Sequence, residues 1–105
     1  MNDIEQILER IKDSVRRTAP GAVVVLYGSY ARGDDRPDSD IDLLVLLDKD
    51  KVTRDDEIKI KYPLYNIETD TGIIISPIII PKKIWETKHK ISPFYHNVTK
   101  EGKYL

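Results

Sequence analysis

The chain has 105 residues and a net charge of −1, which suits one folded domain and excludes a general positive field for nucleic acid. Hydrophobic residues make up 40% and charged residues 33%, a balance that is typical of globular proteins and excludes general disorder. No cysteine is present, so neither a disulfide framework nor a thiolate metal site is expected. The apolar runs are too short to span a bilayer, and the acidic N-terminus is unlike a signal peptide. We therefore expect a cytoplasmic protein with a single domain over residues 1–105 and no membrane partner.

Hydrophobic periodicity and turn-forming residues divide the chain into seven main elements and one helical turn. In chain order they are a helix at 3–17, a strand at 22–28, a helical turn with a polar loop at 29–39, a strand at 40–48, a helix at about 54–68, a strand at 73–80, and two helices at 81–90 and 92–102. Asn2 or Asp3 can cap the first helix, and Ser92 can cap the last. The order predicts a small mixed α/β (α+β) fold, in which helices pack against a sheet of about three to four strands.

Two prolines and one apolar run refine this outline. Pro63 would kink or break the helix at 54–68, whose segment IKIKYPLY also alternates with the period of a strand. Pro77 has no N–H group, which favours an edge position or a bulge for the strand at 73–80. The strand at 40–48 is apolar on both faces after its first three residues, so we expect it in the centre of the sheet.

Asp40 and Asp42 stand at the start of this central strand. Side chains two residues apart on a strand point to the same face, about 6.5–7 Å from each other. Two carboxylates at this separation repel one another, and the repulsion raises one pKa unless a cation lies between them. Carboxylate oxygens are the hard ligands that Mg²⁺ prefers. The pair therefore indicates a magnesium site, with solvated residues at the entry of a strand as the alternative.

A phosphate-binding turn is predicted on the neighbouring strand. Gly28 ends the strand at 22–28, and Ser29 opens a helical turn whose first backbone N–H groups are free to bind a phosphate. Ser29 adds a hydroxyl donor, and Arg32 lies one turn further on, where its guanidinium can approach a phosphate oxygen. A phosphate cradle beside a carboxylate pair is the composition of a metal–nucleotide site.

The segment GSYARGDDRPDSDID resembles the signature of the DNA polymerase β-like nucleotidyltransferase superfamily, in which Gly-Ser and Asp-x-Asp are separated by ten residues. It is most similar to the minimal nucleotidyltransferases (MNT) of bacteria and archaea. The resemblance implies that Gly28 and Ser29 contact the triphosphate and that two Mg²⁺ ions bind to Asp40 and Asp42. An acceptor hydroxyl then attacks the α-phosphorus, and pyrophosphate leaves.

The remaining family positions match less completely. Asp38 and Ser39 fall where we expect residues that shape the loop, and Ser39 is included among the nucleotide-binding candidates. A third carboxylate is expected on the last long strand, which holds none, and Ser76 occupies the corresponding position. Glu68 and Asp70 are possible replacements, although ordinary turn residues are the favoured interpretation. Loss of a positioned base typically slows a reaction by about 10²–10⁴-fold, so we expect a weak or acceptor-restricted enzyme.

The resemblance also implies partners. The nucleotide is expected to be ATP or another NTP, and the acceptor to be a hydroxyl group on a partner protein such as a HEPN-domain toxin, with this chain as its antitoxin. The absence of a basic patch disfavours a nucleic acid as acceptor. The alternative is a catalytically weak or inactive NTP-binding module that neutralises its partner by direct contact. A small-molecule acceptor of the aminoglycoside type fits less well, because those enzymes usually carry an added helical domain.

Aromatic residues gather late in the chain, where closure of the core over the sheet is favoured over a partner-binding patch. These residues are Trp85, Phe94, Tyr95 and Tyr104. His89 and His96 do not share a helical face at metal-ligand spacing, so surface or packing roles are expected for both. None of these residues is assigned to the nucleotide site.

Overall fold

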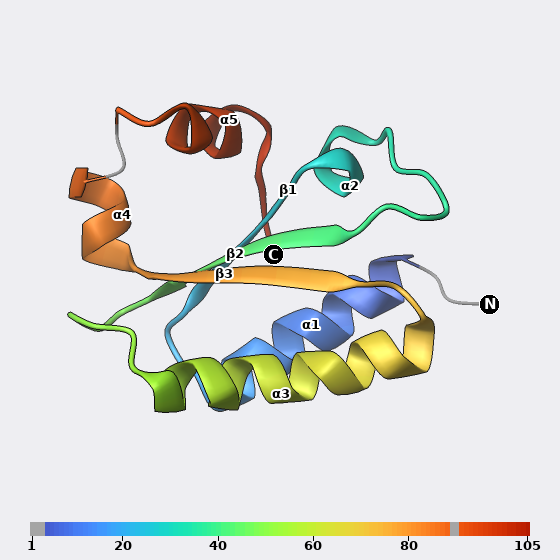
Figure 1. The fold of residues 1–105 in the computed structure, drawn as a ribbon, viewed down its shortest axis with the longest axis horizontal. Coiled ribbons are helices and arrows are strands. Elements are labelled where there is room, and N and C mark those ends of the chain that lie inside the picture. Colours follow the sequence, from blue (N-terminus) through green and yellow to red (C-terminus); the bar gives the residue numbers. More distant parts are fainter. Residues whose placement is uncertain (1–3, 89–90) are drawn as a thin grey trace.

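The computed structural model describes residues 4–88 and 91–105, and Figure 1 shows their arrangement. In chain order the elements are α1 (Ile4–Thr18), β1 (Val23–Tyr27), α2 (Ser29–Arg32), β2 (Ile41–Leu47), α3 (Arg54–Thr71), β3 (Ile75–Pro81), α4 (Lys82–Lys88), α5 (Pro93–Glu101) and β4 (Lys103–Tyr104). Ser92 caps α5 and His96 is exposed, as predicted, whereas Asn2, Asp3 and His89 lie outside the described residues. None of the helices described here is long and apolar enough to cross a membrane.

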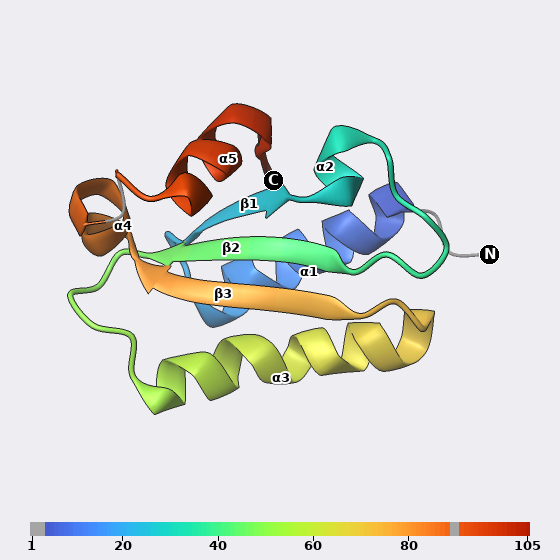
Figure 2. The same cartoon turned by 45° about the horizontal axis from the view of Figure 1, so that its top comes forward.

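The sheet has the strand order β3-β2-β1-β4, and Figure 2 shows its three long strands side by side. β1 pairs antiparallel with β2 and with β4, whereas β2 pairs parallel with β3. The parallel pair needs a crossover connection, which α3 supplies. The mixed α/β fold, the central place of the strand at 40–48 and the edge position indicated by Pro77 are all confirmed. The sequence does not predict β4, because a strand of two residues has no periodicity and forms only by pairing with β1.

The two faces of the sheet are covered by different helices (Figure 1). α1 and α3 pack on one face, and the side chains that β2 buries there are Ile41, Leu43, Val45 and Leu47. α4 and α5 pack on the other face, and the core there includes Leu44, Leu46, Trp85 and Val98. The two sets alternate along β2 because successive side chains of a strand point to opposite faces.

α3 is one continuous helix with Pro63 in its interior, so the predicted break at this proline is wrong. An interior proline removes a hydrogen bond and costs about 3 kcal/mol or more. A capping box offsets part of this cost, because the Thr53 side chain accepts from the Asp56 N–H and the Asp56 carboxylate accepts from the Thr53 N–H. Burial of one apolar row offsets the rest. That row consists of Ile60, Leu64 and Ile67.

Three of the four late aromatic residues close the core over the sheet. Trp85 is 7% exposed, and its ring centroid lies 5.6 Å from that of Phe94 and 4.9 Å from that of Tyr95. Phe94 also meets Tyr27 of β1 edge to face at 5.3 Å, a geometry that aromatic rings favour. Tyr104 is 78% exposed on β4, so the predicted core role is confirmed for three residues and wrong for the fourth.

Candidate functional site

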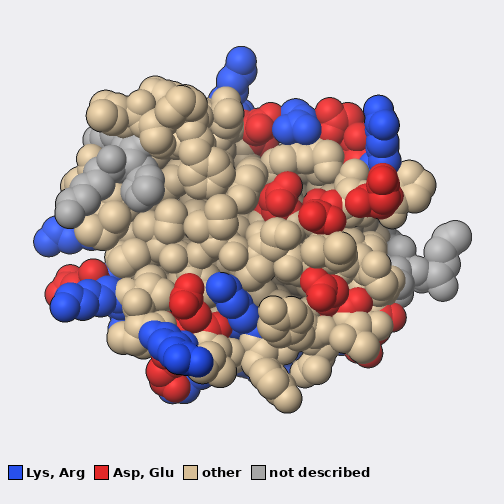
Figure 3. Space-filling model, viewed as in Figure 1, with Lys and Arg blue, Asp and Glu red and all other residues tan. Residues whose placement is uncertain are grey.

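The predicted carboxylate pair lies at an open end of the sheet. Asp40 precedes β2 and is exposed, while Asp42 is the second residue of β2 and is half-buried. Asp42 is on the face that α4 and α5 cover, but these helices pack against the far part of β2, at Leu44 and Leu46. Figure 3 shows acidic side chains gathered over the start of β2 and the loop that follows α2. The site is therefore an acidic surface that is open to solvent.

Gly28 brings the turn after β1 against the Asp42 carboxylate. Tyr27 pairs with Asp42 across the β1–β2 ladder, so Gly28 is the first residue beyond that pair. Its φ of +78° lies in the region that glycine adopts without strain. A Cβ atom at this position would overlap the Oδ2 atom of Asp42. Glycine is therefore required both by the backbone and by the close approach of the carboxylate.

The turn of α2 leaves two backbone donors without a partner. The N–H groups of Ala31 and Arg32 both donate to the Gly28 carbonyl at 3.1 Å. Among the described residues, no acceptor is found for the N–H groups of Ser29 and Tyr30 or for the Ser29 hydroxyl. The groups predicted to bind phosphate are thus unsatisfied within this part of the chain, and they can bind an anion.

The electrostatic surroundings of Asp42 favour a bound cation. Burial raises the pKa of Asp42 above its ordinary value, the neighbouring Asp40 raises it further, and Arg32 acts in the opposite direction. Burial also raises the pKa of Tyr27, and the charge of Asp42 adds to that effect. Burial is the larger cause of both shifts, and the charges of Asp40 and Asp42 add to it. A cation bound between the two carboxylates would relieve this repulsion.

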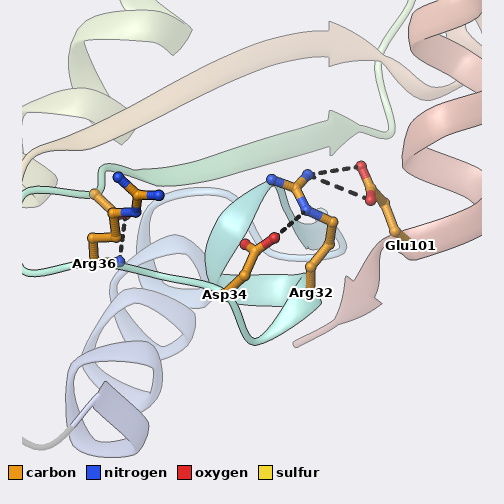
Figure 4. A network of polar contacts seen from close by, with 5 residues as sticks. Arg32, Asp34, Arg36 and Glu101 are labelled. Atoms are coloured by element: carbon orange, nitrogen blue, oxygen red, sulfur yellow. Dashed lines mark hydrogen bonds and ion pairs between the residues drawn. The ribbon is translucent and has the colours of Figure 1, made fainter.

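Arg32 forms ion pairs with two carboxylates outside the predicted pair, those of Asp34 and Glu101 (Figure 4). Its Nε donates to Asp34 Oδ2 at 3.1 Å, and its Nη1 donates to the Glu101 carboxylate at 3.3 and 3.4 Å. Asp34 is two residues away, whereas Glu101 ends α5 and is 69 residues away along the chain. These ion pairs use Nε and Nη1, so within the described residues the Nη2 group of Arg32 is left to contact a phosphate. Glu101 is a neighbour of the site that local sequence spacing cannot reveal.

Ser39 closes the loop between α2 and β2. Its hydroxyl accepts from the Arg36 N–H at 2.8 Å, and its own N–H donates to the Arg36 carbonyl at 2.9 Å. This reciprocal pair gives Ser39 the loop-shaping role that was expected of it. Asp38 is exposed and does not take part in the closure. The hydroxyl hydrogen of Ser39 is left to donate, so its contact with a nucleotide stays a prediction.

Ser76 lies beside Asp42 on the neighbouring strand. The register of the parallel pair joins these two residues, so their side chains share a face of the sheet. The acidic residues considered as replacements are engaged elsewhere: Glu68 accepts from the Ile75 N–H at 2.8 Å, and Asp70 pairs with an arginine of α1 at 2.9 Å. Within the described residues, no three acidic or histidine side chains are grouped to hold a metal ion. The carboxylate pair therefore has no third acidic ligand from this part of the chain.

The donor set fits a magnesium ion that is shared with a triphosphate. Asp40 and Asp42 offer hard oxygen ligands, and two carboxylates suffice for Mg²⁺ because it keeps several waters and binds substrate phosphates directly. Gly28 leaves space for the Asp42 carboxylate against the turn, where a Cβ atom would displace it. The free N–H groups of Ser29 and Tyr30 can hold phosphates next to such an ion.

Tyr27 is a neighbour of the site that the sequence pattern does not single out. It pairs in register with Asp42, is half-buried, and contacts Phe94 of α5 with its ring. Its position directly before Gly28 is the only local signal. The partner across the ladder depends on the register of two strands, which residue types alone do not specify.

Comparison with known proteins connects this geometry to a family. A profile of the nucleotidyltransferase domain matches residues 8–100. Two proteins of Methanocaldococcus jannaschii are similar over most of the chain. "Putative protein adenylyltransferase MJ0141" is 40% identical over 83 residues, which cover 78% of this chain and 73% of its own length. "Putative protein adenylyltransferase MJ0604" is 29% identical over 110 residues, which cover 100% of this chain and 99% of its own length.

A solved structure shares the fold. The crystal structure of a toxin–antitoxin with AMP-PNP superimposes with a TM-score of 0.65 at 18% identity, over 91% of this chain and 69% of its own chain. The matched domain and the two archaeal relatives identify the chain as an enzyme of the transferase class. The chain therefore belongs to the nucleotidyltransferase domain family, which confirms the resemblance of its sequence to the minimal nucleotidyltransferases.

Proposed function

We propose that this protein transfers AMP from ATP, bound with Mg²⁺, to a hydroxyl group of a partner protein. One observation carries the proposal: the Asp42 carboxylate lies directly against the turn formed by Gly28 and Ser29, whose free N–H groups can bind a triphosphate. Membership of the nucleotidyltransferase family supports the transfer of a nucleotide. The names of the two archaeal relatives support AMP as the transferred group and a protein as the acceptor.

In this reaction the acceptor oxygen forms a bond to the α-phosphorus of ATP, and the bond from that phosphorus to the pyrophosphate oxygen breaks. Asp40 and Asp42 would hold Mg²⁺, which when bound supplies charge stabilisation at the attacking and leaving oxygens. The N–H groups of Ser29 and Tyr30 orient the triphosphate, and the Ser29 hydroxyl donates to a phosphate oxygen. The proton of the acceptor passes to a carboxylate of the pair or to water.

The partner that we propose is a HEPN-domain toxin, for which this chain acts as the antitoxin. The similar structure of a toxin–antitoxin with AMP-PNP supports a partner of this kind and an adenine nucleotide. The net charge of −1 and the acidic surface around Asp42 disfavour a polyanionic acceptor such as tRNA. A hydroxyl on a protein side chain meets no such repulsion.

A second candidate function is neutralisation of the partner by contact alone. It is favoured by Ser76, which stands beside Asp42 where a third carboxylate would supply a base. A neutral hydroxyl accepts a proton poorly, and the lack of a positioned base typically costs about 10²–10⁴-fold in rate. With this function the chain would bind its nucleotide and its partner without transferring AMP.

ATP labelled at its α-phosphate, incubated with the HEPN-domain protein, distinguishes the two functions. We expect Mg²⁺-dependent labelling of the partner by the wild type and a loss of about 100-fold or more in Asp42→Asn, since a charge that stabilises the transition state is removed. Asp38→Asn is the matched control, because Asp38 is an exposed carboxylate of the same loop outside the pair.

Two outcomes would favour the second candidate function over AMP transfer. If the wild type labels nothing at any enzyme concentration, the chain is no adenylyltransferase for this partner. If Asp42→Asn neutralises the toxin as well as the wild type does, neutralisation does not depend on the carboxylate pair, and the binding-module function is supported.

A further inference from the structure

α5 lies beside the candidate site and contacts its neighbourhood at both ends. In its first turn, Phe94 meets the ring of Tyr27, the residue that precedes the Gly28 turn. At its last residue, the carboxylate of Glu101 accepts from Nη1 of Arg32 at 3.3 and 3.4 Å. The second contact reaches a residue that is predicted to bind phosphate, so it has a direct consequence for the nucleotide.

The position of Glu101 is not explained by its own helix. The carbonyl groups at the end of a helix carry partial negative charge, so a carboxylate in the last turn is normally disfavoured. Glu101 is nevertheless the last residue of α5, and its side chain is only 28% exposed. The guanidinium of Arg32 compensates this charge. The ion pair therefore accounts for a glutamate at this position.

The backbone holds Glu101 in a fixed place relative to β1. Gly102 follows it, and a Cβ atom at Gly102 would overlap a carbonyl of α5 and lie 2.7 Å from Cγ1 of Val25. β4 then pairs with β1 at Val25 and Leu26. Because β1 also leads directly into α2, both partners of the ion pair are attached to the same strand. The distance between them is therefore set by the sheet.

Two carboxylates hold the Arg32 guanidinium and leave one of its nitrogens free. Asp34 accepts from Nε at 3.1 Å and Glu101 accepts from Nη1, so within the described residues Nη2 makes no contact (Figure 4). The guanidinium is a planar and rigid group. Hydrogen bonds at two of its nitrogens therefore fix the directions in which the hydrogens of the third one point.

The guanidinium is held from the side away from the carboxylate pair. The charges that act on the pKa of Asp42 are those of Asp40, which raises it, and of Arg32, which lowers it. Asp34 and Glu101 are not among them, although a negative charge close to Asp42 would raise this pKa. Arg32 is thus nearer to the pair than the two carboxylates that hold it. A phosphate that shares a cation with Asp42 then lies on the side where Nη2 is free to donate.

We propose that Glu101 is a positioning residue for the nucleotide, because it holds the Arg32 guanidinium so that Nη2 donates to a phosphate oxygen of Mg-ATP. The inference deepens the proposed function and rests on it, since it concerns how the same site binds its triphosphate. Without Glu101 the long side chain of Arg32 has to be ordered when the nucleotide binds, and this ordering weakens the affinity. The ion pair is partly exposed, so the effect is modest.

A purely electrostatic effect of Glu101 would have the opposite sign. Its negative charge reduces the attraction between Arg32 and the phosphates, so removal of the charge alone would strengthen binding. Glu101→Gln removes the charge and keeps an oxygen that accepts from Nη1, whereas Glu101→Ala removes both. Comparison of the two variants therefore separates positioning from charge.

The test measures the affinity of each protein by calorimetry, once for Mg-ATP and once for inorganic tripolyphosphate with Mg²⁺. The variants are Glu101→Ala, Glu101→Gln, Arg32→Ala, and the double variant of Glu101→Ala with Arg32→Ala. Glu86→Ala is the matched control, because Glu86 is an exposed glutamate of α4 and is not one of the carboxylates that pair with Arg32. Labelling of the HEPN-domain protein gives kcat and the KM for ATP, and circular dichroism confirms that each variant is folded.

We expect Glu101→Ala to bind both ligands about three- to fivefold more weakly, with an equal rise in the KM for ATP and an unchanged kcat. Glu101→Gln should bind at least as tightly as the wild type, and Glu86→Ala should resemble the wild type. Arg32→Ala should bind about tenfold more weakly or worse, because a charged hydrogen bond is lost. In that background Glu101→Ala should cause no further loss, since a positioning residue acts only through the group that it holds.

The proposal is overturned if Glu101→Ala binds Mg-ATP as tightly as the wild type or more tightly, since Glu101 then competes with the phosphates or takes no part. It is also overturned if Glu101→Ala weakens binding equally with and without Arg32, because the loss is then structural. If the coupling is found but no partner is labelled, AMP transfer fails and the positioning role stands. If the partner is labelled and the coupling is absent, the proposed function stands and the role of Glu101 is refuted.

Discussion

The two faces of the central strand differ in what they contribute. On the face that α1 and α3 cover, the β2 residues Ile41, Leu43 and Val45 are completely buried. On the other face the alternating residues begin with the half-buried Asp42, and burial is complete only from Leu44 onwards. β2 thus belongs to a closed core through one face and to an open acidic site through the other.

This difference explains how a pair of carboxylates can stand next to the most apolar segment of the chain. A buried charge without a partner is costly, and Asp42 keeps part of its surface in water because α4 and α5 pack further along the sheet. The closed face holds β2 in place, so the open end does not have to contribute packing. One face of β2 therefore stabilises the fold, and the other face carries the candidate site.

The largest effect is expected where the closed face is damaged. Leu43→Ala truncates a side chain that is 0% exposed, and it should lower the free energy of unfolding by about 2–5 kcal/mol. Ile78→Ala, at a 41% exposed position on the open face, should cost about 1 kcal/mol or less. Urea unfolding followed by circular dichroism measures both values. Equal losses at the two positions would show that the faces contribute alike.

The sequence predicts the closed face well because the residues of β2 after Asp42 are all apolar, which indicates a strand that is buried on both sides. Prediction fails where a distant contact decides the structure. Pro63 breaks the local rule for helices because the buried row of α3 and the capping box outweigh its cost. β4 forms because the end of the chain reaches β1, which no local pattern of two residues can indicate.

On the open face, the motif predicts which residues come together but not what each side chain contacts. Gly28 and Asp42 meet through the antiparallel pairing of β1 with β2, in agreement with the prediction that the turn and the carboxylates lie on neighbouring strands. Ser76, which the family resemblance placed at the position of the third carboxylate, does lie beside Asp42 through the register of the parallel pair. Arg32, however, is held by Glu101 from 69 residues away, a contact that depends on how α5 packs and has no local signal in the sequence.

A second prediction adds charge to the open face. Ser76→Asp places a carboxylate beside Asp42, and it should raise the rate of AMP transfer by about tenfold or more because the new group can accept a proton and hold a cation. Ser76→Asn, of similar size without the charge, is the control. Initial rates of partner labelling at saturating Mg-ATP measure the effect. An unchanged rate in Ser76→Asp would show that the position opposite Asp42 does not limit catalysis.

A third prediction separates the close approach at Gly28 from its backbone conformation. Gly28 and Gly33 have φ values of +78° and +80°, so alanine at either position should cost about 1 kcal/mol of stability. Only at Gly28 would the new Cβ overlap the Asp42 carboxylate, whereas nothing lies within 4 Å of a Cβ at Gly33. We therefore expect Gly28→Ala to bind Mg-ATP about tenfold more weakly and Gly33→Ala to bind it normally. Equal affinities in calorimetry would mean that the turn does not position the carboxylate.

The smallest expected effect is the change in stability when the charge of Asp42 on the open face is removed. Burial and Asp40 raise the pKa of Asp42 in the folded protein, so the folded state binds a proton there more tightly than the unfolded state does. Ionised Asp42 therefore lowers stability above the raised pKa, and this cost disappears as the pH falls below the ordinary value of 3.8. Asp42→Asn should be more stable than the wild type at neutral pH by roughly 0.5 kcal/mol, and it should lose that advantage in acid.

Urea unfolding of the two proteins across this pH range measures the difference, and Mg²⁺ supplies a control. If Mg²⁺ binds the ionised pair in the folded state, as we propose, added Mg²⁺ should stabilise the wild type at neutral pH and have little effect on Asp42→Asn. If the variant were less stable than the wild type at neutral pH, Asp42 would be contributing packing or hydrogen bonds to the fold. The open face would then be a second structural face, and its contrast with the closed one would be lost.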